Sequence, residues 1–266
     1  MNEIEKKADV SPANPLQHGL SVNPVHYFTG RVIMTNLIDQ FFSAVFGTVS
    51  SSKVFNSLTQ TADRLYDFVY VKVFGLPFIV LGARQTGKTT LIEWLRQNVR
   101  ALDEFQPAPT APGGDAVGSF SSYIGDETMR LKPTRDVGGE YEMWETDWLD
   151  LFRETKPRGI IFMLDHTDVL QHKDALNYVM NMIEEEADAK RNLKAVMILV
   201  NKSDLWLANT TLDKLMTNYS NEIKRLHNQA ERLGYQATIY SSSVGTGVGV
   251  RDAMRTFFNS IRPQPK

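Results

Sequence analysis

The residues from Gly82 to Thr89 have the types and the spacing of a loop that binds phosphate groups. They run Gly-Ala-Arg-Gln-Thr-Gly-Lys-Thr and stand between the apolar run at 78–81 and a segment with helical periodicity. Glycines let backbone N–H groups turn inward around phosphates, and the start of the helix adds positive potential. Lys88 would reach the β- and γ-phosphates of a nucleotide, while the Thr89 hydroxyl would bind Mg²⁺. This Walker A pattern predicts a nucleotide site that includes Gly82, Arg84, Gln85, Thr86, Gly87, Lys88, Thr89 and Thr90.

The motif Asp136-Val-Gly-Gly139 comes later in the chain and would complete such a site. Asp136 would hold Mg²⁺ through a water molecule, and the N–H of Gly139 would contact the γ-phosphate. By itself this tetrapeptide is also a common turn, so its meaning depends on the phosphate loop ahead of it.

A third motif, Asn201-Lys-Ser-Asp204, ends the apolar run at 195–200 and carries the chemistry of guanine recognition. The Asp204 carboxylate can accept hydrogen bonds from N1–H and the exocyclic amine of guanine, whereas adenine offers no donors in that arrangement. Lys202 can lie over the base, and Asn201 can tie neighbouring loops together. A polar loop after a strand is the alternative explanation.

Apolar runs and helical patterns alternate from residue 76 onward, and this alternation predicts how the motifs are positioned. The runs suited to buried parallel strands are 76–82, 159–165, 195–201 and 236–241. Helical patterns are expected at 88–102, 141–155, 174–190, 212–233 and 248–261. Segments 116–124 and 127–135 flank Gly125-Asp126 and predict a hairpin. We therefore expect an α/β fold with a doubly wound, mostly parallel sheet and with ligands at the carboxyl ends of its strands.

Three serines, Ser241, Ser242 and Ser243, end the last of these runs. They stand where another loop would close over the base, and we expect a backbone N–H near Ser242 to meet the guanine oxygen. As a motif the serines are weak, so this prediction depends on their position.

The chain ahead of residue 76 divides into two parts by composition. Residues 1–30 are polar and interrupted by prolines, which predicts a flexible tail. Residues 31–75 have apolar side chains at three- and four-residue spacing and are expected to form an amphipathic helical extension of the nucleotide-binding domain at 76–262. Asp39 disfavours a membrane span at 31–50. Docking on the domain or on a partner is favoured over an interfacial membrane helix, because the polar face lacks Lys and Arg.

The composition narrows the classes of function. The chain has 266 residues, a net charge of −2 and no cysteine. The lack of a basic excess argues against broad nucleic-acid binding. The lack of cysteine excludes disulfides and thiolate metal sites, and it is consistent with a cytoplasmic protein.

Together the motifs resemble those of the small GTPases, and especially of the ADP-ribosylation-factor-like branch. Asp136-Val-Gly-Gly-Glu140 is similar to that branch's Asp-Val-Gly-Gly-Gln, and the run at 159–165 is similar to its fourth strand. Asn201-Lys-Ser-Asp204 matches the guanine motif, and the three serines stand where the family has Ser-Ala-Lys. The resemblance implies a six-stranded Ras-like sheet with Mg²⁺ and with GTP and GDP as ligands. It also implies that the bound nucleotide controls contacts with a protein effector or regulatory partner. In such a switch, two loops of the GTPase contact the γ-phosphate and change conformation after hydrolysis.

The resemblance places a Mg²⁺-binding threonine between the 88–102 helix and the hairpin. Pro109-Thr110 resembles the family's Pro-Thr, so Thr110 is the expected ligand. Thr128 and Thr134 are the alternatives, but they fall inside the second strand of the hairpin. The prolines near Thr110 also fit a rigid spacer.

The sequence departs from the family at residues expected to catalyse GTP hydrolysis. Glu140 replaces the glutamine that positions the attacking water, and its carboxylate could accept a proton but would also repel the γ-phosphate. Arg84 and Gln85 occupy positions that are often glycine, and Arg84 could either obstruct the water or supply positive charge. We assign the catalytic roles to Glu140 and Arg84 and expect a slow GTPase. The alternatives are a GTP-locked scaffold subunit and an ATP-dependent P-loop kinase or ATPase.

Two further groups have ordinary structural explanations. Trp144 and Trp148 lie at helical spacing and are expected in the core, with an effector surface as the alternative. A solvated loop without a metal is expected for the polar residues after the fourth strand, which are His166, Asp168, His172 and Asp174.

Overall fold

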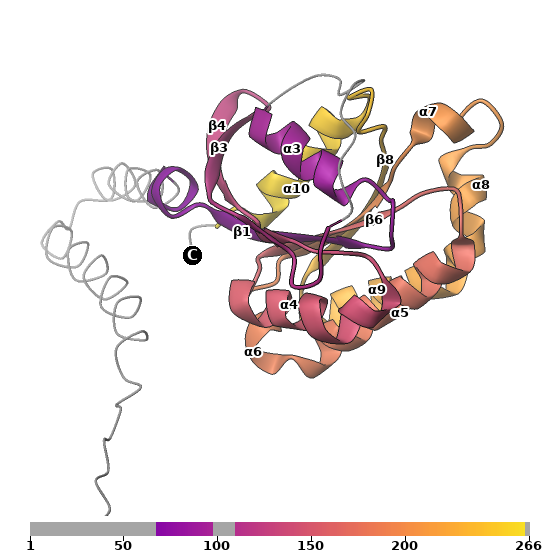
Figure 1. Ribbon diagram of the computed structural model, residues 1–266, viewed down its shortest axis with the longest axis horizontal. Helices are drawn as coiled ribbons and strands as arrows, with labels where there is room; N and C mark the ends of the chain where they lie inside the picture. The colour runs from indigo at the N-terminus through magenta and orange to yellow at the C-terminus, as the bar shows by residue number, and fades with distance from the viewer. Residues whose placement is uncertain (1–67, 98–109, 264–266) are drawn as a thin grey trace, which may run out of the picture. The chain divides into compact units, whose positions relative to one another are not determined.

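Six strands form one mixed sheet within residues 68–97 and 110–263, which are the residues that the computed structural model describes (Figure 1). The order across the sheet is β3-β4-β1-β6-β7-β8. The strands are β1 (Leu76–Gly82), β3 (Phe120–Ile124), β4 (Glu127–Lys132), β6 (Gly159–Leu164), β7 (Ala195–Val200) and β8 (Gln236–Ser241). All neighbours are parallel except β3 and β4. The predicted fold class is confirmed.

The helices follow the predicted pattern, with shifted boundaries. They are η1 (Val69–Phe74), α3 (Lys88–Gln97), η2 (Tyr141–Met143), η3 (Trp144–Trp148), α4 (Leu149–Thr155), α5 (Val169–Glu185), α6 (Ala187–Lys190), α7 (Ser203–Trp206), α8 (Leu212–Met216), η4 (Thr217–Tyr219), α9 (Ser220–Leu233) and α10 (Val250–Ile261). α5 begins before residue 174 because the Asp168 side chain accepts a hydrogen bond from the Gln171 N–H and caps the helix. The helix expected at 212–233 is divided into α8, η4 and α9.

Helices cover both faces of the sheet, with α3 and α10 on one face and α4, α5 and α9 on the other (Figure 1). Alternate residues of the central strands enter two separate cores. Ile160 and Phe162 of β6 pack on the α5 side, whereas Ile161 and Met163 pack on the α10 side. Because both faces are buried, these strands appear in the sequence as unbroken apolar runs.

The predicted hairpin differs from the structure at its outer ends. β3 pairs with β4, but β2 (Asp115–Val117) pairs separately with β5 (Thr134–Asp136). Pro133 stands between β4 and β5 and has no N–H to donate to a ladder, so the strand breaks there. The break separates β5, which ends at Asp136, from the six-stranded sheet.

Of the predicted N-terminal parts, only residues 68–75 are described, so the tail at 1–30 and the rest of the extension at 31–75 lie outside the described residues. The described part packs against the domain. Val71 in η1 is fully buried, and the Lys72 ammonium donates a hydrogen bond to the Thr128 carbonyl. Within 68–97 and 110–263, none of the helices has the length and hydrophobicity needed to cross a membrane.

Candidate functional site

Gly82 and Gly87 let the loop after β1 pass close to its neighbours. Gly82 has a φ of +148°, and a Cβ added there would lie 2.2 Å from the carbonyl oxygen of Met163. Gly87 has a φ of +96°, and a Cβ there would lie 2.5 Å from Nδ2 of Asn201. Because a side chain at either position would displace its neighbour, the path of the loop requires glycine at both.

The other loop residues are placed by the same turn. Gln85 is exposed and has a φ of +61°, a left-handed conformation that glycine adopts more readily. Thr86 is fully buried, and its hydroxyl donates to the Ala83 carbonyl at 3.0 Å. Thr89 and Thr90 lie in the first turn of α3. The last residues of the loop therefore lie at the N-terminus of α3, where a bound anion is stabilised.

Lys88 lies buried inside this loop, with 7% of its surface exposed. Its ammonium donates hydrogen bonds to the carbonyl oxygens of Gly82 (2.9 Å) and Ala83 (3.0 Å). Burial lowers the pKa of Lys88 to about 8, although the charges of Asp136 and Glu140 act to raise it. A phosphate against the ammonium would favour the charged form and raise this pKa again.

The predicted metal ligands lie together beside the loop. Thr89 Oγ1 donates to Asp136 Oδ2 at 2.6 Å, and Thr110 Oγ1 lies 3.4 Å from the same oxygen. Asp136 Oδ1 is buried and has no hydrogen-bond partner within the described chain, and burial raises the pKa of this carboxyl. Hydroxyl and carboxylate oxygens are the ligands that Mg²⁺ prefers, so these residues fit the ion. The alternative ligands, Thr128 and Thr134, belong to β4 and β5 instead.

Two buried tryptophans donate hydrogen bonds to the glycine carbonyls of the Asp136–Gly139 loop. Trp148 Nε1 donates to Gly138 at 2.7 Å, and Trp144 Nε1 donates to Gly139 at 3.2 Å. The indoles stack with ring centroids 5.3 Å apart, and both are buried, which confirms the predicted core packing. The helical spacing of the two tryptophans predicts that they are buried. It does not predict which carbonyl oxygen accepts the hydrogen bond from each indole N–H.

Gly139 and Glu140 lie against the phosphate loop. A Cβ on Gly139 would lie 2.4 Å from the carbonyl carbon of Ala83, so the two loops touch through their backbones. Beside this contact, Glu140 Oε1 lies 3.8 Å from Arg84 Nε. The Arg84 side chain is 58% exposed and that of Glu140 is 30% exposed, so the ion pair is weak. The two residues predicted to be catalytic are therefore neighbours.

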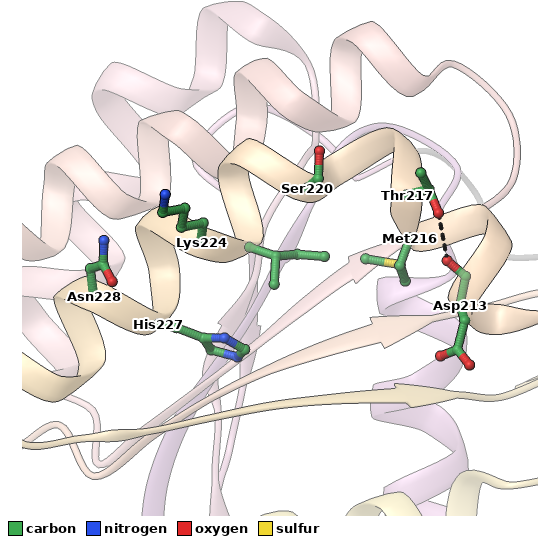
Figure 2. A pocket seen from close by; sticks show the side chains of 8 residues that line it. Asp213, Met216, Thr217, Ser220, Lys224, His227 and Asn228 are labelled. Atoms are coloured by element: carbon green, nitrogen blue, oxygen red, sulfur yellow. Dashed lines mark hydrogen bonds between the residues drawn. The ribbon is translucent and has the colours of Figure 1, made fainter.

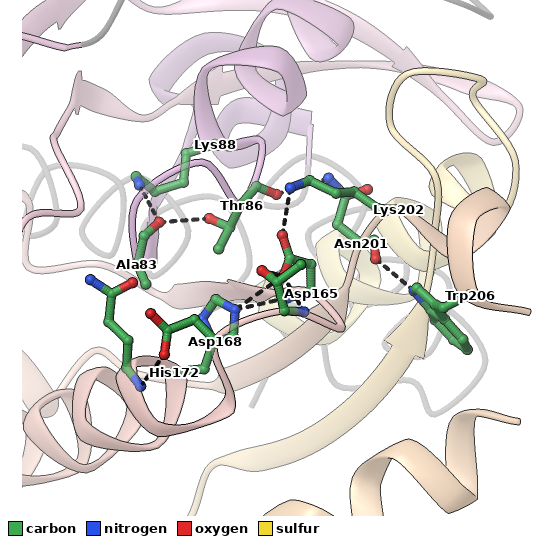
Figure 3. Close-up of polar contacts among 11 residues, drawn as sticks. Ala83, Thr86, Lys88, Asp165, Asp168, His172, Asn201, Lys202 and Trp206 are labelled. Atoms are coloured by element: carbon green, nitrogen blue, oxygen red, sulfur yellow. Dashed lines mark hydrogen bonds and ion pairs between the residues drawn. The ribbon is translucent and has the colours of Figure 1, made fainter. Parts of the chain in front are cut away.

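On the base side, the Asn201 side chain joins its own loop to the phosphate loop and to the loop after β8. Its Nδ2 donates to the Thr86 carbonyl at 2.8 Å, and its Oδ1 accepts from the Val244 N–H at 2.9 Å. The main-chain carbonyl oxygen of Asn201 accepts from Trp206 Nε1 at 2.9 Å (Figure 3). The predicted role of Asn201 in tying loops together thus has a specific set of contacts.

Lys202 points toward Asp165, a residue for which the sequence predicts no site role (Figure 3). Lys202 Nζ lies 2.6 Å from Asp165 Oδ2, and His172 Nε2 lies 3.2 Å from Asp165 Oδ1. The solvated loop expected for His172 is therefore wrong: this histidine belongs to α5 and is only 1% exposed. His166 and Asp174 are exposed, and no three His, Cys, Asp or Glu side chains in the described chain could hold a metal ion.

Asp204 lies beyond the end of β7, and the three serines begin at Ser241, the last residue of β8. The Asp204 side chain is exposed at the start of α7 and has no hydrogen-bond partner among the described residues. Ser241 ends β8, and the Ser242 N–H donates to the Val200 carbonyl at 2.9 Å. The Ser243 N–H donates to Val248 at 2.9 Å, so in this conformation neither amide is left for the expected contact with the guanine oxygen. The expected contact between an N–H near Ser242 and the guanine oxygen stays a prediction.

A groove of about 610 Å³ lies along α8 and α9 (Figure 2). It is lined by Asp213, Met216, Thr217, Ser220, Ile223, Lys224, His227 and Asn228. None of the predicted nucleotide contacts belongs to this set, so the groove is not assigned to the nucleotide.

The phosphate loop follows β1, the Asn201–Asp204 motif follows β7 and the serines end β8, so the candidate site lies at the carboxyl ends of parallel strands. This arrangement defines a P-loop nucleotide-binding protein. The ADP-ribosylation factor family matches residues 72–261, and the chain therefore belongs to this family of small GTPases.

Among solved structures, the chain is similar to the Arl6 (BBS3) small GTPase from Trypanosoma brucei with the bound nucleotide analogue GppNp. The two are 18% identical, with a TM-score of 0.48, over 71% of this chain and 99% of that chain. No curated protein matches the chain. The family assignment rests on the match over residues 72–261.

Proposed function

We propose that this chain binds GTP and GDP together with Mg²⁺ and acts as a nucleotide-dependent switch on a protein partner. The observation that carries this proposal is the Asn201 amide, which joins the phosphate loop at Thr86 to the last loop at Val244. Through this bridge, the buried ammonium of Lys88 and the exposed carboxylate of Asp204 belong to one connected site.

Guanine suits the base side of this site. The exposed Asp204 carboxylate, which has no partner within residues 68–97 and 110–263, can accept from both N1–H and the exocyclic amine of guanine. Adenine would leave that carboxylate without donors, which is unfavourable by about 1–3 kcal/mol once the group is shielded from water. This argument also disfavours the alternative of an ATP-dependent kinase or ATPase.

We further propose slow GTP hydrolysis, with Glu140 and Arg84 in the catalytic roles. Glu140 would hold the attacking water, and Arg84 would offset the charge that develops on the phosphate oxygens. Both side chains lie at the contact between the phosphate loop and the Asp136–Gly139 loop. Thr89, Thr110 and Asp136 would hold Mg²⁺, which neutralises phosphate charge when it is bound.

Two measurements on the purified full-length chain test this function. Nucleotide released by denaturation should be GDP or GTP, at about one per chain. Chain loaded with GTP should then release phosphate in a single turnover, and Lys88→Ala should fail to load. A chain that neither retains nor binds guanine nucleotide contradicts the proposal.

A second candidate function is a GTP-locked scaffold subunit of a larger assembly. The place of Arg84 favours it, because its guanidinium lies 3.8 Å from the Glu140 carboxylate, and this weak contact competes with any contact to a phosphate. Retention of GTP without phosphate release over many hours would support the scaffold. Slow but complete release would support the switch.

The partner is proposed to be a protein, since a net charge of −2 offers no broad attraction for nucleic acid. A cytoplasmic location is proposed, with residues 31–50 as a docking element and a peripheral membrane contact as the less favoured alternative. Liposome flotation of the GTP-loaded chain should show little binding. Robust flotation that depends on GTP would reverse this ranking.

A further inference from the structure

Asp165 is a buried carboxylate directly beyond β6, and only 1% of its surface is exposed. Its Oδ1 accepts hydrogen bonds from the Thr167 N–H at 2.8 Å and from the Thr167 hydroxyl at 2.5 Å, and it also lies 3.2 Å from His172 Nε2. Its Oδ2 lies 2.6 Å from Lys202 Nζ. One oxygen is thus anchored to the segment that leads into α5, and the other one holds the lysine (Figure 3).

The ion pair with Lys202 requires the Asp165 carboxyl group to be ionised. Burial alone would raise the pKa of Asp165, but the hydrogen bonds from His172, Lys202 and Thr167 outweigh it and hold the pKa well below its usual range. The carboxylate is therefore ionised at neutral pH. Lys202 has a permanent anionic partner that lies within the protein rather than on a ligand.

The sheet brings these two residues together. β6 and β7 are parallel, with Leu164 opposite Val200, so the segments that follow them leave the sheet side by side. Lys202 then adopts a φ of +57°, which is uncommon for a residue other than glycine. Its side chain is 31% exposed, so the stem stays accessible while the ammonium is bound.

An untethered lysine would lose side-chain entropy when a ligand ordered it. The ion pair with Asp165 removes most of that freedom before any ligand arrives. Preordering of this kind increases affinity without adding a contact to the ligand.

We propose that Asp165 is a positioning residue of the nucleotide site, which holds the Lys202 ammonium so that the lysine stem is preordered against the face of the base. The proposal rests on the proposed function, because it requires a guanine nucleotide to bind beside Lys202. Asp165 acts only through the lysine. Since the stem meets the flat face of a base, its effect is independent of the exocyclic amine, unlike the effect of Asp204.

The test is a double-mutant cycle on the full-length chain, with equilibrium binding of GTP and ITP as the readout. Inosine lacks the exocyclic amine but has the same flat face. Asp165→Asn and Lys202→Met should each weaken binding of both nucleotides about tenfold and by the same factor for each. The double variant should bind no more weakly than Lys202→Met. Asp188→Asn, which alters an exposed ion pair with Arg191, is the matched control and should bind as the parent does.

The outcomes separate this inference from the function on which it rests. Parental affinity in Asp165→Asn, or a further loss when this change is added to Lys202→Met, overturns the positioning role. If Asp165→Asn does not fold, Lys202→Met alone decides, because parental affinity in that variant shows that tethering is not needed. A parent chain that binds neither GTP nor GDP rejects the proposed function instead.

Discussion

The base side and the phosphate side of this site are built in different ways. On the base side, Asn201 and Lys202 are already paired within the protein, whereas the Asp204 carboxylate is exposed and has no partner among the described residues. Asn201 uses both its amide nitrogen and its amide oxygen, and the Lys202 ammonium lies 2.6 Å from the Asp165 carboxylate. These contacts join the ends of neighbouring strands, so the base side is organised by the sheet itself.

On the phosphate side, charges are buried without full compensation. Burial lowers the pKa of Lys88 and raises that of Asp136, and one oxygen of that aspartate has no hydrogen-bond partner within the described chain. Arg84 and Glu140 meet at 3.8 Å, a loose contact on the surface.

From this difference, and on the proposed function, we expect the two halves to behave differently. The base side, where Asn201 and Lys202 are already held, should change little when a ligand binds. The phosphate side, with its uncompensated charges, should be stabilised by a phosphate and a divalent cation, so we expect its conformation to depend on which nucleotide is bound.

The largest expected effect is the loss of binding on removal of the Lys88 ammonium. Lys88→Ala should weaken GTP binding by at least about a thousandfold, because several charge-assisted contacts with the phosphates disappear together. Isothermal titration with GTP and Mg²⁺ measures this. Lys214→Ala, which alters an exposed lysine on α8, is the control. Tight binding in Lys88→Ala would remove the phosphate side from the site.

The same lysine should lower the stability of the nucleotide-free protein. Its pKa is about 8 in the folded protein, below its ordinary value of 10.5, so folding disfavours the charged form. The penalty is full below pH 8 and disappears as the pH rises to 10.5, so stability should increase across that window by at most about 3 kcal/mol. Urea unfolding of Lys88→Met should show a more stable protein at pH 7 and lack that part of the increase. A destabilised Lys88→Met would contradict the uncompensated charge.

The next effect concerns the tryptophans that hold the Asp136–Gly139 loop. Trp148→Phe leaves the Gly138 carbonyl without its buried donor and should lower the free energy of unfolding by about 1–3 kcal/mol. Trp94→Phe is a matched control, since the Trp94 Nε1 is buried but has no hydrogen-bond partner among the described residues. Equal losses in the two variants would show that packing, and not the hydrogen bond, matters at Trp148.

The smallest expected effect is on catalysis. Glu140→Ala and Arg84→Ala should each slow single-turnover hydrolysis about tenfold, or about 1.4 kcal/mol, while GTP affinity stays nearly unchanged. If Arg84 obstructs the water instead, Arg84→Gly should accelerate hydrolysis. Unchanged rates in all three variants would assign catalysis to a partner or favour the scaffold.

The fold and the main motifs could be predicted because they depend on local patterns. β6 and β7 are unbroken apolar runs since both of their faces are buried, and the phosphate loop needs Gly82 and Gly87 at fixed spacing. The phosphate loop directly follows β1 and the Asn201–Asp204 motif directly follows β7, so the strand ends place these two motifs. The roles of these residues toward a ligand are predictions that the experiments test.

The missed features depend on contacts between distant segments. Asp165 looks like an ordinary residue at a strand end, and only the alignment of β6 with β7 brings it to Lys202. His172 was expected in solvent because polar residues surround it in the sequence, but the start of α5 turns it inward. The Ser242 amide is engaged because sheet pairing continues past the end of β8.

The most direct test of the central claim is competition among GTP, ITP and ATP for the parent chain and for Asp204→Ala. Asp213→Ala, which changes an exposed aspartate of α8, is the matched control. The parent and the control should bind GTP at least about a hundredfold more tightly than ATP, with ITP between them, because two hydrogen bonds to a carboxylate are at stake. Asp204→Ala should lose most of that preference. Equal affinity of the parent chain for GTP and ATP, or unchanged GTP affinity in Asp204→Ala, would contradict guanine recognition by this site.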